Sequence, residues 1–248
     1  MDIIQALTQE LQVEKWQIEA AVKLIDEGNT IPFISRYRKE ATGSLNDEVL
    51  RNLHERLLYL RNLEDKKKQV LSSIEEQGKL TEELKKSILE AQTLVVVEDL
   101  YRPYRPKRRT RATIAKEKGL EPLANLILLQ MTDKSIEEEA ESYVSEEKEV
   151  KNVKEAIAGA SDILAESVAD EADYRIRIRN LTVKSGSVVS SAKKENEKSV
   201  YEMYYDFREP LSKVTGYRVL AINRGEKEKF LTVKVEAPEE RILRYLEK

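Results

Sequence analysis

Lysine and arginine side chains are concentrated between residues 102 and 118, a stretch that we call the basic segment. It lies within the sequence EDLYRPYRPKRRTRATIAKEKGLEPLA (98–124) and holds eight cations and one glutamate, which leaves a local charge of +7. Phosphate groups bind to such clusters because each neutralised phosphate releases condensed counterions. Tyr101 and Tyr104 can offer ring faces to unstacked bases. These residue types therefore indicate contact with a nucleic-acid backbone.

The cations of the basic segment differ in their neighbours. Arg102 and Arg105 follow Glu98 and Asp99, and charge-assisted bonds to these carboxylates favour a structural role for both arginines. The cations further along the segment lie too close together in sequence for all of them to be paired internally, which favours phosphate contact. The candidate binding residues of the segment are Lys107, Arg108, Arg109, Arg111, Lys116 and Lys118.

A second candidate surface follows later in the chain. Arg175 and Arg179 are four residues apart, so they share one face of a predicted helix, and we include both as candidate nucleic-acid-binding residues. The same face can equally meet the acidic segment EEEAESYVSEEKEV (137–150), which is otherwise a solvated acidic surface. Both interpretations stay open at this point.

A third basic cluster lies near the N-terminus, in the sequence SRYRKE. Its cations are Arg36, Arg38 and Lys39. Short helices of this composition often pair their charges internally, so the sequence favours a structural role for this cluster.

The composition argues against catalysis. The chain has no Cys, its one His (His54) lies in the middle of a predicted helix, and no Gly-rich phosphate loop is present. We therefore predict no enzyme activity, no metal site and no cofactor. The net charge of −3 means that any nucleic-acid contact must depend on a local patch.

The sequence also predicts a cytoplasmic protein without a membrane partner. The longest uncharged apolar run, AQTLVVV, is too short to span a bilayer. The N-terminal sequence MDIIQALTQELQ lacks the basic-then-apolar layout of a signal peptide.

Apolar residues at helical spacing predict the elements that must position these side chains. We expect a short helix opened by Pro32 and further helices over residues 3–12, 14–27, 46–77, 81–91, 119–131, 135–144, 151–168 and 170–181. Residues 94–118 are expected to form a loop with short turns, stiffened by proline. The N-caps expected from the sequence include Thr81, Ser135 and Asp170.

The last part of the chain differs in character. Residues 185–199 (SGSVVSSAKKENEKS) are predicted to be a solvated connector, residues 214–226 a helix closed by Gly225, and residues 230–236 a strand. A helix that begins near Arg241 has no stop signal, which suggests a fragment of a longer protein.

We therefore predict a mostly all-α, elongated multi-helix scaffold with a small α+β end at the C-terminus. Three parts are expected: a helical scaffold with the basic segment (1–118), a helix-turn-helix-like unit (119–185), and a connector with a small α+β segment (186–248). The helix-turn-helix prediction rests on the short helices and tight joints of the middle part.

Four stretches together resemble one known family. They are GNTIPFISRYRKEATGSLND, VEDLYRPYRPKRRTRATIAKEKGLEPLA, ASDILAESVAD and YEMYYDFREPLSKVTGYRVLAINRGE. In this order they resemble the N-terminal region of the bacterial Tex family of transcription accessory proteins. The resemblance covers nearly the whole chain.

The resemblance implies a non-catalytic, mostly helical nucleic-acid-binding scaffold with a helix-turn-helix-like region. It also implies downstream domains: a degenerate RNase-H-like domain, helix-hairpin-helix motifs and an OB-fold that is the principal nucleic-acid binder. It assigns no binding residue in this part, so the candidate residues rest on charge clustering alone.

The function predicted from these observations is non-specific contact with an RNA or DNA backbone by part of a transcription accessory factor. The alternative is a protein-interaction module that docks downstream domains of the same protein or the transcription machinery. In that alternative the cations of the basic segment are each paired with a carboxylate.

Overall fold

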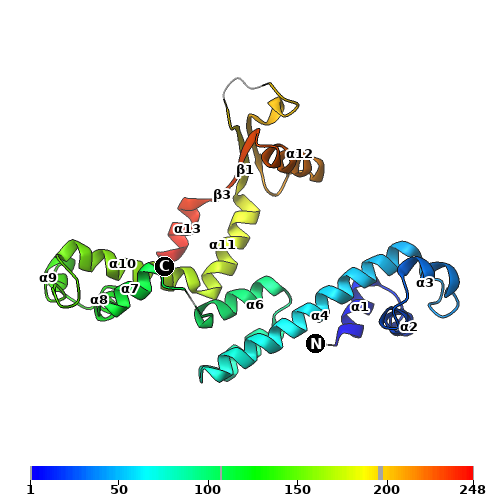
Figure 1. The fold of residues 1–248 in the computed structure, drawn as a ribbon, viewed down its shortest axis with the longest axis horizontal. Helices are drawn as coiled ribbons and strands as arrows, with labels where there is room; N and C mark the ends of the chain where they lie inside the picture. The colour runs from blue at the N-terminus through cyan, green and yellow to red at the C-terminus, as the bar shows by residue number, and fades with distance from the viewer. Residues whose placement is uncertain (1, 107, 195–197, 248) are drawn as a thin grey trace. The chain divides into compact units, whose positions relative to one another are not determined.

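The computed structural model describes residues 2–106, 108–194 and 198–247. Within these residues the fold consists of 13 α-helices, two short 3-10 helices and one three-stranded sheet (Figure 1). The mostly all-α fold class with a small β-containing end is therefore confirmed. The chain forms two compact units, Met1–Arg105 and Pro106–Lys248. The three-part division at residues 118 and 185 and the helix-turn-helix-like unit stay predictions.

A single long helix, α4 (Asp47–Glu76), organises the first unit. Its N-terminus is capped by Asn46, whose side chain accepts a hydrogen bond of 2.8 Å from the backbone N–H of Val49. Its 30 residues correspond to about 45 Å of helix. One stripe of α4 is buried, and its apolar members are Leu50, Leu53, Leu57, Leu60, Leu63, Val70 and Ile74. The helix predicted over residues 46–77 is confirmed.

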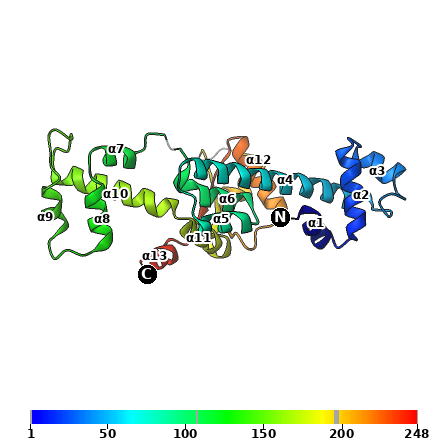
Figure 2. The same cartoon turned by 90° about the horizontal axis from the view of Figure 1, so that it is seen from below.

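The other helices of the first unit surround α4. They are α1 (Ile3–Leu11), α2 (Lys15–Asp26), α3 (Ile31–Tyr37), α5 (Glu82–Glu90), α6 (Leu94–Tyr101) and the 3-10 helix η1 (Arg102–Tyr104). Helices α1, α2 and α3 all contact α4 and lie near its N-terminal part in both views (Figures 1 and 2). They complete one core, in which Leu7, Ile18 and Ile34 are fully buried.

The loop predicted for residues 94–101 is wrong, because these residues form helix α6. Thr93 caps this helix by accepting a hydrogen bond from the N–H of Val96. Val97 is fully buried, so the apolar run contributes to the core that α4 and α6 share. Because α4 offers an apolar surface, the four apolar residues gain more by packing against it as a helix than by staying exposed in a loop.

Two ion pairs fix the helices α1 and α2 to α4. Arg56 donates two hydrogen bonds, of 2.5 and 2.7 Å, to Glu10. Arg61 donates two hydrogen bonds, of 2.7 and 2.8 Å, to Asp26. In each pair the arginine hydrogen bond is the main cause that lowers the pKa of the carboxyl, against a smaller opposing effect of partial burial.

We expect these pairs to make the first unit sensitive to acid. A carboxyl whose folded-state pKa is lowered contributes stability above its unfolded-state pKa and loses it as the pH falls through the folded-state value. Unfolding of the first unit should therefore become easier below about pH 4. Urea denaturation followed by the fluorescence of Trp16, the only tryptophan, measures this. The Arg56→Gln, Arg61→Gln variant should show a weaker pH dependence, and equal dependence in both proteins would contradict the assignment.

The helical part of the second unit packs around α10 (Val153–Asp170). Helices α7 (Arg111–Glu117), α8 (Glu121–Leu129) and α9 (Ile136–Glu141) all contact it (Figure 2). The buried members of this second core are mostly small: Ala112, Ala115, Leu120, Leu123, Ala124, Ala140, Val150, Ala156, Ala160 and Ile163. Small side chains allow the helices to approach closely.

Two details of this region correct the sequence analysis. Residues 111–117 were expected to be part of a loop, but they form α7, because Ala112 and Ala115 can be buried against α10. Helix α11 (Ala172–Ser185) is capped by Glu171 and not by Asp170, which is the last residue of α10. The cap expected at Ser135 is confirmed, since its Oγ accepts a hydrogen bond from the N–H of Glu138.

The sheet has the order β2-β1-β3, with both pairs antiparallel. Its strands are β1 (Ser187–Ala192), β2 (Asp206–Pro210) and β3 (Leu231–Glu236). The connector predicted for residues 185–199 is therefore wrong in part, because β1 is the central strand. Four of its six residues are Ser or Ala, which hide the strand pattern, but Ser190 is buried and its hydroxyl donates to the carbonyl of Tyr204. The strand expected over residues 230–236 is confirmed as β3.

Helix α12 (Gly216–Lys227) packs against β3, and the short η2 (Glu202–Tyr204) precedes β2. Gly225 was predicted to close α12, but it lies inside the helix. A Cβ at this position would lie 2.6 Å from Leu231 Cδ1, so the missing side chain permits close packing. Beyond the sheet, α13 (Glu239–Leu246) contacts α11. Among the described residues, no helix combines the length and apolar character needed to cross a membrane.

Candidate nucleic-acid interface

Helix α7 positions the later part of the basic segment. Its N-terminus is capped by Thr110, whose Oγ1 accepts a hydrogen bond of 3.0 Å from the N–H of Thr113. Ala112 and Ala115 are buried against α10, whereas the flanking cations Arg111 and Lys116 are exposed. The exposed side chain of Arg111 nevertheless reaches Asp162 on α10. Helix α7 thus packs through its alanines and leaves these two cations accessible to solvent.

Among the residues that the structure describes, three candidate cations of the basic segment form ion pairs. Arg109 contacts Glu117 at 2.9 Å, Arg111 contacts Asp162 at 3.5 Å, and Lys116 contacts Glu121 at 3.1 Å.

These pairs are open to water. The side chains of Arg109 and Arg111 are 69% and 85% exposed. Exposed pairs of this kind contribute only about 0 to 1 kcal/mol to stability. A phosphate group can therefore replace the carboxylate partner at low cost.

The remaining candidate cations of the segment differ in their contacts. Arg108 is exposed and has no ion pair or hydrogen bond with any residue that the structure describes. Lys118 donates a hydrogen bond of 2.8 Å to the carbonyl of Glu149, and therefore contacts the acidic segment. Lys107, also a candidate, lies outside the described residues.

The beginning of the basic segment is held to the first unit. Arg105 lies 3.8 Å from Glu98, which agrees with the structural role expected for this arginine. Tyr101 shares a hydrogen bond of 2.9 Å with Ser73, and both Tyr101 and Tyr104 pack against the core around α4. The two tyrosines therefore serve the fold, and the expectation that they offer faces to bases gains no support.

Arg175 and Arg179 are half-buried on α11. Arg175 Nη1 donates a hydrogen bond of 3.1 Å to the carbonyl of Ala169, close to the C-terminal end of α10. Arg111 instead contacts α10 at Asp162, seven residues earlier, which corresponds to about 10 Å along the helix. The two predicted groups thus meet α10 at different points, and the structural interpretation of Arg175 gains support.

A pocket of about 200 Å³ lies where α7 meets α10. Its lining combines apolar side chains, among them Ile114, Leu120 and Val150, with the cations Arg111 and Lys118 and the carboxylates Glu155 and Asp162. Because these charges balance, the pocket by itself does not favour phosphate.

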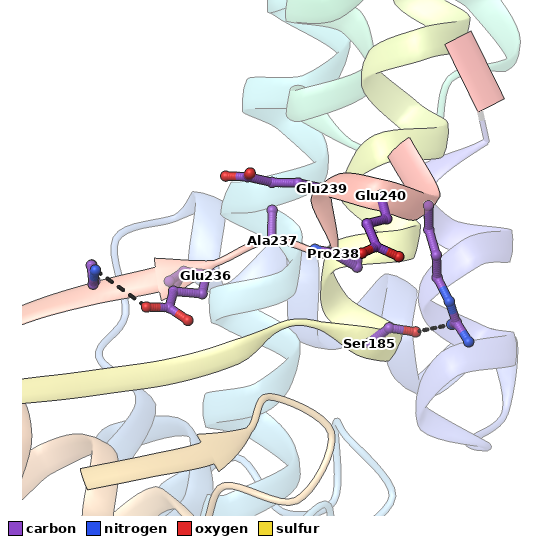
Figure 3. Close-up of a pocket in the computed structure, with 9 residues that line it drawn as sticks. Ser185, Glu236, Ala237, Pro238, Glu239 and Glu240 are labelled. Atoms are coloured by element: carbon purple, nitrogen blue, oxygen red, sulfur yellow. Dashed lines mark hydrogen bonds and ion pairs between the residues drawn. The ribbon is translucent and has the colours of Figure 1, made fainter. Parts of the chain in front are cut away.

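A larger pocket of about 910 Å³ lies beside the end of β3 (Figure 3). Its labelled carboxylates are Glu236, Glu239 and Glu240, and Arg241 donates to Ser185 at 2.8 Å. A hydrogen bond from Arg208 is the main cause that lowers the pKa of Glu236, so this carboxylate is charged at neutral pH. The three carboxylates outnumber the two cations of the lining, Lys234 and Arg241, and this negative balance disfavours phosphate. We therefore do not assign the nucleic-acid contact to this pocket.

In the part of the chain that the structure describes, no group of three His, Asp or Glu side chains is arranged to hold a metal ion. The partners Glu117 and Asp162 were not recognised from the sequence, because neither stands at a regular helical spacing from its arginine. Only the packing of α7 on α10 brings Asp162 to Arg111.

Comparisons with family models match two parts of the chain. Residues 1–75 match the model described as Tex-like protein N-terminal domain. Residues 132–246 match the model described as Tex central region-like.

Comparisons with curated proteins give consistent relatives. The uncharacterized protein YdcI of Bacillus subtilis is 48% identical over 98% of this chain and 34% of its own length. The transcriptional accessory protein Tex of Neisseria gonorrhoeae is 44% identical over 94% of this chain and 31% of its own length. The human S1 RNA-binding domain-containing protein 1 is 33% identical over 94% of this chain and 24% of its own length. The chain thus spans about a third or less of the length of these relatives.

Proposed function

This chain belongs to the Tex family of transcriptional accessory proteins, and from this premise we propose that its basic segment contacts a nucleic-acid backbone without reading sequence. The rest of the chain is a helical scaffold that positions this contact. A non-catalytic role and a cytoplasmic location are parts of the same proposal.

The observation that best supports the proposal is that the cations on α7 and just before it are exposed to solvent. Arg108 is exposed and unpaired among the described residues, and the pairs of Arg109 and Arg111 are open to water. Contacts of this kind fix the position of a protein on a duplex or strand but carry no sequence information. Specific affinity then has to come from elsewhere in the longer protein.

The names of relatives agree with such a role in a longer protein. A human relative is named for an S1 RNA-binding domain, and the chain covers 24% of that relative. We propose that downstream domains supply most of the affinity, and that this chain adds backbone contacts to RNA or DNA.

A second candidate function is docking of a protein partner. It is favoured by the three ion pairs of Arg109, Arg111 and Lys116, since pairing with carboxylates is what this alternative requires. Tyr217 and Leu220 on α12 are 64% and 69% exposed, and such side chains suit an interface with downstream domains or with the transcription machinery.

A salt series tests the proposal. We expect the full 248-residue chain to bind labelled single-stranded RNA or duplex DNA, measured by fluorescence anisotropy, with an affinity that falls as salt rises. The variant Lys107→Ala, Arg108→Ala, Arg109→Ala, Arg111→Ala should lower the slope of log K against log salt by about 3 to 4, because four phosphate contacts are lost.

The matched control removes four exposed lysines elsewhere in the second unit: Lys134, Lys151, Lys154 and Lys227. This variant has the same net charge as the test variant and should keep most of the slope. If the test variant and the control lose affinity equally, the segment is not a specific contact. If neither variant changes a measurable affinity, the docking function is favoured.

A further inference from the structure

The end of α3 and the loop that follows it carry a second group of cations. Residues 36–41, which we call the 36–41 loop, comprise the last two residues of α3 and the next four; they line a hollow of about 330 Å³, and all six are exposed. Within the described residues, no ion pair joins Arg36, Arg38 or Lys39 to a carboxylate. The internal pairing that the sequence favoured for these cations is therefore wrong. Glu40 is the one acidic residue of the loop, which leaves a local charge of +2.

Side-chain hydrogen bonds hold the backbone of this loop and of the two residues that follow it. Thr42 is fully buried, and its hydroxyl donates to the carbonyl of Arg38 at 3.2 Å. Gln17 of α2 donates hydrogen bonds of 3.2 and 3.1 Å to the carbonyls of Thr42 and Gly43. A Cβ on Gly43, whose φ is +62°, would lie 2.5 Å from the Trp16 ring, so this position requires glycine. The loop thus presents its cations from a fixed base.

Aromatic rings support the same surface. Tyr37 is 68% exposed, and its ring centroid lies 5.4 Å from that of Phe33. The guanidinium of Arg38 lies 5.4 Å above the Phe33 ring. Phe33 therefore orients both the exposed tyrosine and one cation.

We infer that the 36–41 loop binds single-stranded nucleic acid. Arg36, Arg38 and Lys39 contact consecutive phosphates, and an unstacked base stacks on the free face of Tyr37. A cationic surface that lacks carboxylate partners has no ion pair to break before it binds phosphate. An exposed tyrosine beside these cations favours a base over an acidic peptide, because a peptide of carboxylates offers no ring to stack on it.

This inference does not depend on the basic segment, because the loop belongs to the first unit and the candidate cations of α7 belong to the second. The two sites can therefore be tested separately on the same chain.

The first test removes the charges of the loop. With labelled oligouridylate RNA and the full 248-residue chain, the variant Arg36→Gln, Arg38→Gln, Lys39→Gln should lower the salt slope by about 2, because single strands lose about 0.7 per contact. The control variant Lys79→Gln, Lys85→Gln, Lys86→Gln removes three exposed lysines from the same unit and should keep the slope. Equal slopes for the loop variant and the unchanged protein would overturn the inference.

The second test examines stacking. Tyr37→Ala should weaken RNA binding at least about fivefold without changing the salt slope, whereas Tyr37→Phe should bind as the unchanged protein does. Neither substitution should alter binding to duplex DNA, whose bases are already stacked. All these side chains are exposed, and an unchanged Trp16 emission spectrum verifies that the loop keeps its fold. If Tyr37→Ala binds RNA as tightly as Tyr37→Phe does, the stacking contact does not exist.

A labelled polyglutamate peptide serves as a competing probe. Binding of this peptide as tightly as RNA, with both unaffected by Tyr37→Ala, would identify the loop as a docking site for an acidic protein and overturn the inference. If only the loop variant lowers the salt slope, this inference is supported and the proposed role of the basic segment fails. If only the basic-segment variant lowers the salt slope, the proposed role of the basic segment is supported and this inference fails.

Discussion

Replacement of Glu64 by alanine is expected to lower the unfolding free energy of the first unit by about 3 kcal/mol at neutral pH. The reason is Lys67, whose side chain is only 2% exposed although it carries a charge. Its Nζ donates hydrogen bonds of 3.0 Å to Glu64 and 2.9 Å to the carbonyl of Leu89. Without Glu64 the buried ammonium keeps only the neutral carbonyl of Leu89 as a hydrogen-bond partner, which is costly.

The opposite substitution should cost less. Lys67→Met keeps the volume of the buried stem and removes the charge, while Glu64 is 19% exposed and can turn to water. Replacing a buried charge by an apolar side chain of similar size is often nearly neutral. We therefore expect Glu64→Ala to be the more destabilising variant, and the double variant Glu64→Ala, Lys67→Met to recover most of the loss.

The pair of Glu64 and Lys67 should also make the stability of the first unit depend on pH. Burial is the largest single effect and raises the pKa of Glu64, but the hydrogen bonds and charges of its cationic neighbours, with Lys67 first among them, together outweigh it, so the net pKa is lowered. The contribution of the pair is then present above the unfolded-state carboxyl pKa and is lost as the pH falls through the folded-state value. Lys67→Met should reduce this part of the acid sensitivity.

Urea denaturation followed by Trp16 fluorescence measures all three variants, because the only tryptophan lies in the first unit. A loss below about 1 kcal/mol for Glu64→Ala would mean that water reaches Lys67 easily. A larger loss for Lys67→Met than for Glu64→Ala would show that the carbonyl of Leu89, rather than the carboxylate, is the important partner.

The second large effect is expected for Gly159→Val, which should destabilise the second unit by about 2 to 3 kcal/mol. Gly159 lies where α10 meets the residues around α7. A Cβ there would be 2.4 Å from Leu120 Cδ1 and 3.2 Å from Ala115 Cβ. Leu120 is itself buried, so it has little space to move aside.

The neighbouring substitution Ala158→Val is the matched control. Ala158 is exposed on the same helix, so it should cost only the lower helix propensity of valine, about 0.6 kcal/mol. Thermal unfolding followed by circular dichroism reports the helices of both units, whereas Trp16 fluorescence reports the first unit alone. The Trp16 transition should stay where it is in both variants, so a shift seen only by circular dichroism belongs to the second unit. If Gly159→Val and Ala158→Val are equally stable, α7 adapts without cost and the close approach is not a constraint.

Gly159→Val also has a functional consequence. Because α7 carries Arg111 and Lys116, displacing this helix should reduce the salt-dependent nucleic-acid binding proposed for the basic segment. Binding that depends on the 36–41 loop should be retained, since that loop lies in the other unit.

Much of the helical architecture follows from local pattern. The stripe of leucines along residues 46–77 and the cap at Asn46 are sufficient to predict α4, because a long amphipathic helix has one favourable way to bury its apolar side. The strand over residues 230–236 was found for the same reason, from its alternation.

The misses arose where local pattern is weak and packing decides. Strand β1 consists largely of serine and alanine, and only its central place between β2 and β3 makes it a strand. Helix α7 was mistaken for a loop because two alanines are a weak apolar signal in the sequence. They are buried only because Gly159 allows α10 to approach them closely.

For the functional surfaces, the sequence by itself determined where cations cluster, since charge density is a property of neighbouring residues. It could not determine which cations are paired, because the partner is often far away in sequence, as Asp162 is from Arg111. The tertiary structure gave carboxylate partners to Arg109 and Arg111, which were expected to be free, and none among the described residues to Arg36 and Arg38, which were expected to be paired. The physical reason is that an ion pair depends on distance in space, and only the packing of helices decides that distance.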